Sequence, residues 1–189
     1  MKFIYLTWFV FIAQTTFSQI QDSTLAIVFE NVYPEQILKL LATNQNQSAR
    51  IADYLYELGF KIPSLNPISN QKINSKFGYR IHPITGEMKK HQGIDIDALQ
   101  NQPVFAAADG YIVEVGYHQY LGNYVKIKHL LNYETIYGHL EAFIVEPNTN
   151  VYQGQIIGTC GSTGRTTGVH LHFSILWHHQ FLNPYPFIF

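Results

Sequence analysis

Short runs in which apolar and polar residues alternate dominate this chain from Ile73 onward. Such alternation places every second side chain on the same face, as is typical of half-buried β-strands. Turn-forming pairs such as Asp109-Gly110 and Leu131-Asn132 separate the runs. Because no helical stretches lie between them, the pattern predicts an all-β sandwich or barrel rather than βαβ units. The expected strands are Val104 to Ala107, Gly110 to Val115, Tyr124 to Lys128, Thr135 to His139, Gln155 to Thr159 and His170 to Trp177.

The first residues have the pattern of an export signal. Met1-Lys2 precedes a mostly apolar run from Phe3 to Ala13, and small residues follow at Thr16 and Ser18. This predicts a signal peptide over residues 1–18 with cleavage before Gln19. An apolar run of about eleven residues is too short to span a bilayer. We therefore expect an exported protein of the periplasm or cell envelope, or a secreted one, without stable membrane insertion after cleavage.

Helical spacing follows over residues 19–66. Pro34 suits the first turn of one helix, and a second is expected from about Ser48 to Leu58, ending at Gly59. The next prolines and asparagines resemble a linker. We thus expect a signal peptide (1–18), a helical N-terminal segment and linker (19–66) and a β domain (67–189). The helical segment has two candidate roles: an extension packed on the main domain, or a segment that crosses the site and keeps it closed.

Composition narrows the range of partners. The chain has 189 residues, of which 47% are hydrophobic and 13% charged, so it can bury one good core and a small appendage. A net charge of -1 and a pI near 6.7 give no electrostatic footprint for nucleic acid or an anionic membrane. The only cysteine, Cys160, cannot form an internal disulfide and is expected to be a small buried residue.

Two histidines at alternate positions, His170 and His172, lie within the last expected strand. Residues i and i+2 of a strand project from the same face, with Cα atoms about 6 to 7 Å apart. Both imidazoles could then bind one metal ion. Alternatively, one could bind the ion while the other reaches the metal-bound water or the substrate. The spacing alone is compatible with both arrangements.

His91 and Asp95 form the second cluster of candidate ligands. On a straight strand they would be about 13 Å apart at Cα, so a bend between them is required. Gly93 lies at that point and accepts bent or positive-φ backbone most readily. Asp97 shares a strand face with Asp95 and is the alternative ligand, but Asp95 is closer to the bend. Two imidazoles and one carboxylate would leave a zinc ion an open fourth position for water, whose pKa the ion can lower to about 7.

Seven short motifs between Ile73 and Pro184 occur in the order that resembles the lysostaphin-like, or LytM-type, zinc peptidases of family M23. They are Ser75-Lys76-Phe77-Gly78-Tyr79-Arg80, His82-Pro83-Ile84-Thr85-Gly86, His91-Gln92-Gly93-Ile94-Asp95-Ile96, Tyr137-Gly138-His139-Leu140, Gly154-Gln155-Ile156-Ile157-Gly158, Gly161-Ser162-Thr163-Gly164 and His170-Leu171-His172-Phe173. The resemblance implies a two-sheet antiparallel fold, the duplicated hybrid motif. It also implies a zinc endopeptidase that cuts peptide cross-links of peptidoglycan.

By position, the resemblance implies that His91, Asp95 and His172 bind one Zn²⁺ ion and that His139 and His170 are the catalytic histidines. Two positions depart from the family pattern: Val169, where proline is usual, and Ser174, where glutamate is common. We expect neither to contact the five site residues. The family includes enzymes for glycine bridges and for D-alanyl to diamino-acid cross-links. Export without a wall-targeting module favours the direct cross-links of stem peptides.

Other classes of function fit less well. A catalytically silent relative that binds cell wall or activates another hydrolase should have lost site residues, whereas all five positions are present. A biotin or lipoyl carrier needs a lysine at a hairpin tip, but Lys126 and Lys128 lie within an expected strand. A zincin is excluded because no His-Glu-x-x-His motif occurs. The partner predicted is therefore a stem or bridge peptide of peptidoglycan.

Several further residues are candidates for substrate contact: Tyr79, Arg80, His82 and Tyr137. Arg80 could instead pair with an internal carboxylate. His129 is expected to make a structural hydrogen bond, and His118 is expected in a solvated loop. His178-His179 is interpreted as a surface turn, because adjacent residues on a strand face opposite ways.

Overall fold

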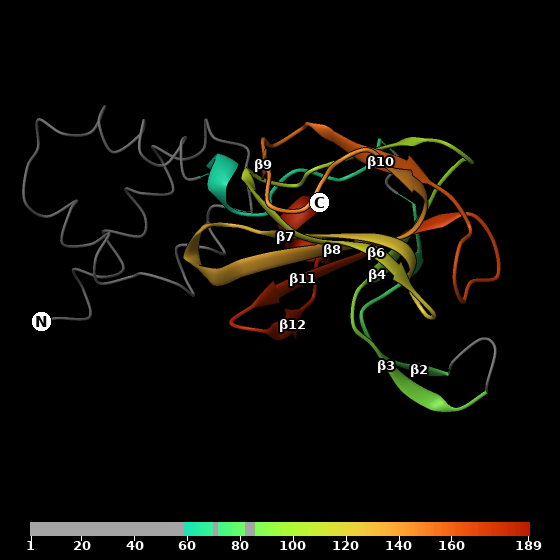
Figure 1. Ribbon diagram of the computed structural model, residues 1–189. Helices are drawn as coiled ribbons and strands as arrows, with labels where there is room; N and C mark the ends of the chain where they lie inside the picture. The colour runs from blue at the N-terminus through green and yellow to red at the C-terminus, as the bar shows by residue number, and fades with distance from the viewer. Residues whose placement is uncertain (1–58, 70–71, 82–85) are drawn as a thin grey trace, which may run out of the picture.

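The computed structural model describes residues 59–69, 72–81 and 86–189, which form an antiparallel β domain (Figure 1). The predicted all-β class is confirmed. The expected signal peptide, the helices before residue 59 and His82 lie outside the described residues. The elements are β1 (Ile73–Ser75), β2 (Gly78–Ile81), β3 (Met88–His91), β4 (Ile94–Asp97), β5 (Pro103–Phe105), β6 (Gly110–His118), β7 (Gly122–Lys128), the 3-10 helix η2 (Leu130–Asn132), β8 (Tyr133–Phe143), β9 (Asn150–Val151), β10 (Ile156–Cys160), β11 (His170–Trp177), β12 (Gln180–Leu182) and α5 (Tyr185–Ile188).

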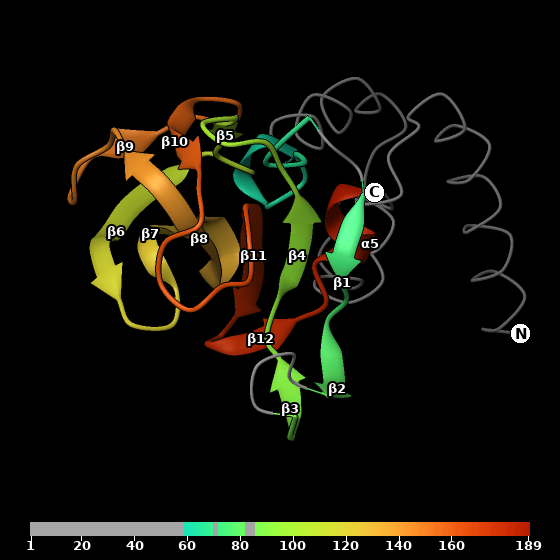
Figure 2. The ribbon, with the colours of Figure 1, turned by 90° about the vertical axis from the view of Figure 1, so that its right-hand side faces the viewer.

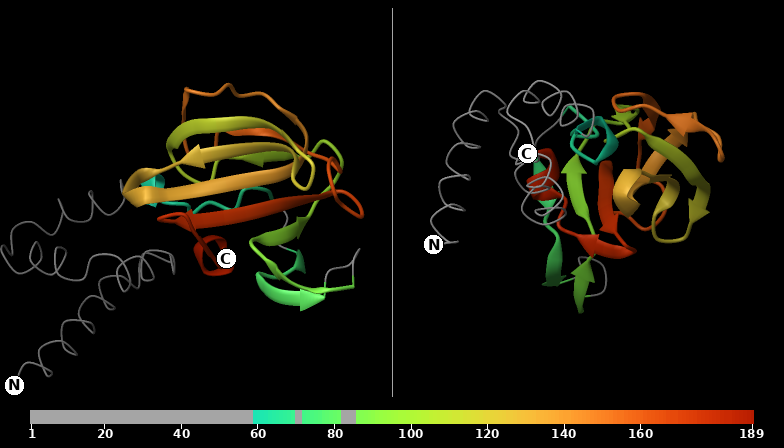
Figure 3. Two further views of the ribbon diagram at one scale, coloured as in Figure 1. Left: turned by 60° about the horizontal axis from the view of Figure 1, so that its bottom comes forward. Right: turned by 90° about the vertical axis from the view of Figure 1, so that its left-hand side faces the viewer.

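The strands form one branched sheet and one separate hairpin. The main row runs β1-β4-β11-β8-β7-β6-β9, and β10 joins it through β8 while also pairing with β5 (Figure 2). The two layers expected of a sandwich are thus hydrogen-bonded to each other. Strands β2 and β3 pair only with each other and extend away from the main sheet as the green hairpin of Figure 3.

Strand β8 connects the layers because it changes its neighbour along its length. Residues 133–138 pair with β11, whereas Leu140, Ala142 and Phe143 pair with β10. His139 lies between the two sets and has a φ of 59°, in the left-handed region. A non-glycine residue there costs about 1 kcal/mol or more, and such residues often occur at functional sites. Gly161, directly after β10, donates to the carbonyl oxygen of His139 (3.1 Å) and accepts from the backbone N–H of His170 (3.3 Å), so it links the two histidines.

Strand alternation separates the core from the site. In β4, Ile94 and Ile96 are buried, whereas Asp95 and Asp97 face the other side. Each fully buried isoleucine contributes about 1.5 to 3 kcal/mol relative to an exposed one. The largest fully buried side chains, which form the core, are Tyr137, Phe173, Ile62, Ile68, Ile94, Ile96, Ile112, Ile127, Leu140, Ile157, Leu171 and Ile175.

The segment before β1 is packed against this core. Residues 59–61 are helical, so the predicted helix end at Gly59 is wrong. Pro63 accounts for the later stop, because a proline disfavours helical backbone at the residue before it. Ile62 and Ile68 are buried in the core, so this stretch does not behave as a free linker. No helix of the described residues is long and apolar enough to cross a membrane.

Candidate active site

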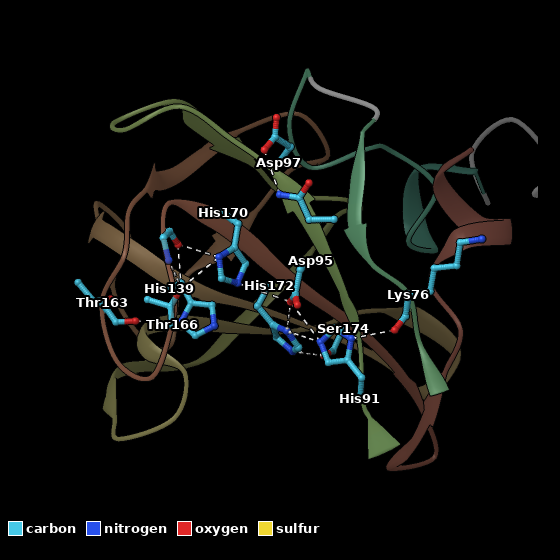
Figure 4. Close-up of polar contacts among 12 residues, drawn as sticks. Lys76, His91, Asp95, Asp97, His139, Thr163, Thr166, His170, His172 and Ser174 are labelled. Atoms are coloured by element: carbon cyan, nitrogen blue, oxygen red, sulfur yellow. Dashed lines mark hydrogen bonds and ion pairs between the residues drawn. The ribbon is translucent and has the colours of Figure 1, made fainter. Parts of the chain in front are cut away.

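Two neighbouring strands place the candidate ligands face to face. His172 of β11 is opposite Asp95 of β4, and His170 is opposite Asp97. Because both strands alternate, the two histidines and Asp95 project to the same side, as expected from the sequence. His91 ends β3 and turns toward them (Figure 4). Segments about eighty residues apart in the chain thereby meet at one point.

The ligand atoms of His91, Asp95 and His172 converge. His172 Nδ1 lies 2.9 Å from Asp95 Oδ1, and His91 Nε2 lies 3.1 Å from both of these atoms. Ligands about 2.0 to 2.1 Å from a tetrahedral zinc ion are about 3.3 to 3.4 Å apart, so the three atoms need to separate only slightly to hold one. Asp97 is instead bound by the side-chain amide of Asn74 at 3.0 Å, which removes it as the alternative.

Each candidate ligand is held by a second contact on its far side. His91 Nδ1 donates to the carbonyl oxygen of Lys76 (2.9 Å), so its proton is on Nδ1 and Nε2 presents a lone pair. Arg80 Nη2 donates to Asp95 Oδ2 (3.2 Å), which leaves Oδ1 for the centre. Burial raises the pKa of Asp95, but the close contacts with the His172 and His91 rings outweigh this effect and hold the pKa well below its usual range. Lone pairs from nitrogen and oxygen thus converge, an arrangement that a cation stabilises.

Ser174 completes this set, and the expectation that it would not touch the site is wrong. Its Oγ lies 3.0 Å from His172 Nε2, and its side chain is buried. When His172 Nδ1 binds a metal, its proton is on Nε2 and donates to Ser174. The alternation of His170, His172 and Ser174 along β11 was a signal for this contact, because the three side chains share a face.

We expect Ser174→Ala to weaken zinc binding about tenfold or more. Removal of the hydroxyl leaves His172 Nε2–H without its acceptor in a buried setting, and such outer contacts typically change metal affinity 10- to 100-fold. Competition with a chelator of known affinity measures the change. Ser162→Ala, an exposed position in the loop before β11, is the matched control. Equal affinities of the two variants would contradict the role assigned to Ser174.

Gly93 is required for a reason other than the one expected. Its φ is not positive, so a left-handed backbone does not explain the glycine. Instead, a Cβ at this position would overlap the carbonyl oxygen of Phe173 and would lie 2.6 Å from Ser174 Oγ and 2.9 Å from His172 Cε1. The glycine therefore permits a close approach between the turn after His91 and β11. The metal ligands of two distant segments meet because this contact is so close.

His139 and His170 lie next to the ligand cluster with the same tautomer. His139 Nδ1 donates to the carbonyl oxygen of Thr163 (2.8 Å), and His170 Nδ1 donates to that of Gly168 (2.8 Å). A carbonyl only accepts, so in both neutral rings Nε2 is the basic nitrogen. His170 Nε2 lies 3.7 Å from Asp95 Oδ1. The ring centroids of His139 and His170 are 4.6 Å apart.

Burial keeps His139 neutral. Desolvation lowers its pKa to about 4, and the nearby His170 and His172 rings act in the same direction against the Thr163 hydrogen bond. At neutral pH the ring is therefore an uncharged base. Thr166 adds a contact to His170, with Oγ1 3.1 Å from Nδ1. Sequence reasoning missed Thr163 and Thr166, because loop residues carry no periodic signal.

The five residues line one cavity of about 440 Å³. Arg80, Val169 and the 165–168 loop line it as well. Of the predicted substrate contacts, Arg80 pairs with Asp95 and Tyr79 is 77% exposed on the hairpin. Tyr137 is fully buried, with its hydroxyl accepting from Ala107 N–H (2.8 Å), so its expected substrate contact is wrong.

The remaining histidines and the cysteine have structural or surface positions. His129 is buried and its Nδ1 donates to the Asp109 carbonyl oxygen (2.8 Å), which confirms the structural hydrogen bond. The His178-His179 turn is exposed, as expected, whereas His118 is exposed but ends strand β6 and does not lie in a loop. Cys160 is buried, and burial raises the pKa of its thiol to about 12. It is therefore an unreactive core residue.

Curated relatives match nearly two thirds of the chain. Peptidoglycan DD-endopeptidase ShyC of Vibrio cholerae is 42% identical over 120 residues, or 63% of this chain and 28% of that protein. DD-carboxypeptidase/endopeptidase Mpg of Neisseria meningitidis is 45% identical over 121 residues, or 64% of this chain and 28% of that protein. The matched region thus spans less than a third of the length of these relatives.

Solved structures agree with this match. A zinc-containing peptidase from Vibrio cholerae superposes with a TM-score of 0.60 at 36% identity, over 66% of this chain and 39% of that one. The catalytic domain of lysostaphin from Staphylococcus simulans gives a TM-score of 0.56 at 34% identity, over 61% of this chain and 90% of that one. The model of peptidase family M23 matches residues 89–184. On this evidence of sequence and fold, the chain belongs to peptidase family M23.

Proposed function

We propose that this protein is a zinc-dependent endopeptidase that hydrolyses peptide cross-links of peptidoglycan. The observation that carries the proposal is the convergence of three metal-ligand atoms, from His91, Asp95 and His172, within 3.1 Å of one another and beside two further imidazoles. Two neutral imidazoles and one carboxylate are a ligand set of catalytic zinc sites, which keep a fourth position open. When bound, zinc supplies a Lewis acid that polarises a carbonyl oxygen and makes water acidic enough to ionise near neutral pH.

The two remaining histidines are proposed to move protons and support charge. Each has its Nδ1 proton fixed on a carbonyl oxygen, so its Nε2 can accept a proton from the attacking water. Once protonated, the same nitrogen can donate to the leaving amine or to the developing oxyanion. The proximity of the rings, 4.6 Å between centroids, allows one to act on the water and the other on the substrate oxygen.

The identity of the substrate is inferred from relatives. ShyC is named a peptidoglycan DD-endopeptidase, and Mpg is named a DD-carboxypeptidase/endopeptidase. Residues 1–18 were predicted to be an export signal, which suits a substrate outside the cytoplasm. We therefore propose action in the cell envelope on stem-peptide cross-links.

Removal and return of metal tests this function directly. Purified protein treated with a chelator should lose all measurable release of fragments from peptidoglycan, and one equivalent of zinc should restore it. Mass spectrometry of the fragments identifies the bond, because hydrolysis of a cross-link converts a dimeric muropeptide into two monomers. Zinc-loaded protein that binds peptidoglycan but releases no fragments would instead support a silent binding module.

A further inference from the structure

Two guanidinium groups line the active-site cavity, those of Arg80 and Arg165. Arg80 is bound to Asp95 at 3.2 Å. Among the described residues, no carboxylate forms an ion pair with Arg165. Since Arg80 and the proposed metal offset the charge of Asp95, the charge of Arg165 has no paired carboxylate within the part of the chain that the structure describes. A partly buried cation in a cleft attracts an anionic group of the ligand.

The local structure holds Arg165 in place. Its backbone N–H donates to the carbonyl oxygen of Tyr120 (3.2 Å), and its guanidinium carbon lies 5.8 Å from the centre of the Tyr120 ring. Such stacking limits the motion of the guanidinium while leaving its N–H donors available. Tyr120 itself lines the cavity and is 51% exposed. The guanidinium is therefore presented at the cavity wall and not lost into solvent.

The loop that carries Arg165 is tightly locked to the rest of the site. Thr163 Oγ1 donates to the carbonyl oxygen of Leu140 (2.7 Å) and accepts from the backbone N–H of Asn123 (2.9 Å). Gly122 and Gly164 have positive φ and pack so closely that a Cβ on either would overlap the other loop. Gly168, three residues after Arg165, accepts a hydrogen bond from His170 Nδ1 through its carbonyl oxygen. Arg165 thus has a fixed position relative to His170.

We propose that Arg165 binds a carboxylate of the substrate next to the scissile bond. This inference rests on the proposed function and names its substrate class. In a direct cross-link from D-alanine to a diamino acid, the carbon that bears the leaving amine can also bear a free carboxylate. A glycine bridge has no carboxylate at that place. Arg165 therefore selects direct cross-links over glycine bridges, because a guanidinium pairs with a carboxylate through two parallel hydrogen bonds.

A substrate pair that differs by one charge tests the assignment. The probes are a cross-linked peptide dimer with a free carboxylate beside the scissile amide and the same dimer with that carboxylate amidated. Zinc-loaded wild-type protein should cleave the free acid with a kcat/KM about tenfold or more higher, mainly through a lower KM. Arg165→Gln should abolish this preference, because loss of the guanidinium lowers kcat/KM for the free acid more than for the amide. The change in preference, and not the loss of activity, is the diagnostic quantity.

Two further variants separate recognition from a structural role. Arg165→Lys keeps the charge but not the paired donors and should retain part of the preference. Lys128→Gln removes a cation at the far end of β7 and should behave like wild type. If Arg165→Gln slows both substrates equally, or if wild type cleaves both equally, the inference is overturned while the proposed function stands. Cleavage of neither by zinc-loaded wild type would overturn the proposed function itself.

Discussion

His172→Ala is expected to lose zinc and activity together, whereas His170→Ala is expected to lose activity and retain zinc. His172 Nδ1 lies 2.9 Å from Asp95 Oδ1 at the centre of the ligand cluster, so its removal takes away one of three ligands. His170 is held through Nδ1 by the Gly168 carbonyl, and its free nitrogen lies 3.7 Å from the same oxygen. Loss of a general base lowers kcat by about 10² to 10⁴ without requiring metal loss.

Metal content per chain, measured with peptidoglycan hydrolysis on the same samples, separates the two histidines. His91→Ala should behave like His172→Ala, and His139→Ala like His170→Ala. His179→Asn on the exposed β11–β12 turn is the control, since asparagine tolerates the left-handed backbone of that position. Circular dichroism establishes that each variant is folded. Zinc retained by the His172 variant and lost by the His170 variant would reverse the assignment within the pair.

The sequence was sufficient to predict the elements that share one simple period. The run from His170 to Trp177 alternates clearly and coincides with β11, and the strands expected at β7 and β10 agree within two residues. Strand β6 instead continues to His118, three residues past its expected end, and β5 ends two residues before its expected end. Alternation also placed His170 and His172 on one face. Strand β8 was longer than expected, because its change of partner from β11 to β10 at His139 is a property of the whole sheet and leaves no local pattern.

The ligands were predictable, but their supports were only partly so. Ser174 continues the alternation of His170 and His172, so its contact with the site could have been found from the strand period. The contact between His91 and the carbonyl oxygen of Lys76 could not have been found in this way, because any residue type can supply a backbone acceptor. The choice of Asp95 over Asp97 also depended on geometry: Asp97 is occupied by the amide of Asn74 and by an ion pair with Lys72 at 3.7 Å.

Gly93→Ala is expected to damage the site severely, although residue 93 is not itself a ligand. The added methyl group would overlap the Phe173 carbonyl oxygen and crowd Ser174 Oγ and His172 Cε1. A backbone oxygen cannot rotate away, so the turn before β4 must move away from β11, where the Phe173 side chain is fully buried in the core. Overpacking of this kind costs about 1 to 3 kcal/mol or more. We expect the free energy of unfolding to fall by about 2 to 3 kcal/mol and zinc affinity to fall about tenfold or more, since His172 is displaced.

Gly116→Ala is the matched control for this prediction, because the two glycines differ in the space available. Gly116 lies in β6, and a Cβ there would meet only the Tyr124 ring at 3.8 Å, an ordinary contact. The free energy of unfolding of the Gly116→Ala variant should change by less than about 0.5 kcal/mol. Denaturant unfolding and chelator competition measure both variants. The prediction is contradicted if the Gly93 variant matches the Gly116 variant in stability and in zinc affinity. That result would show that the turn after His91 and β11 need not approach so closely, and that backbone bending alone explains the glycine.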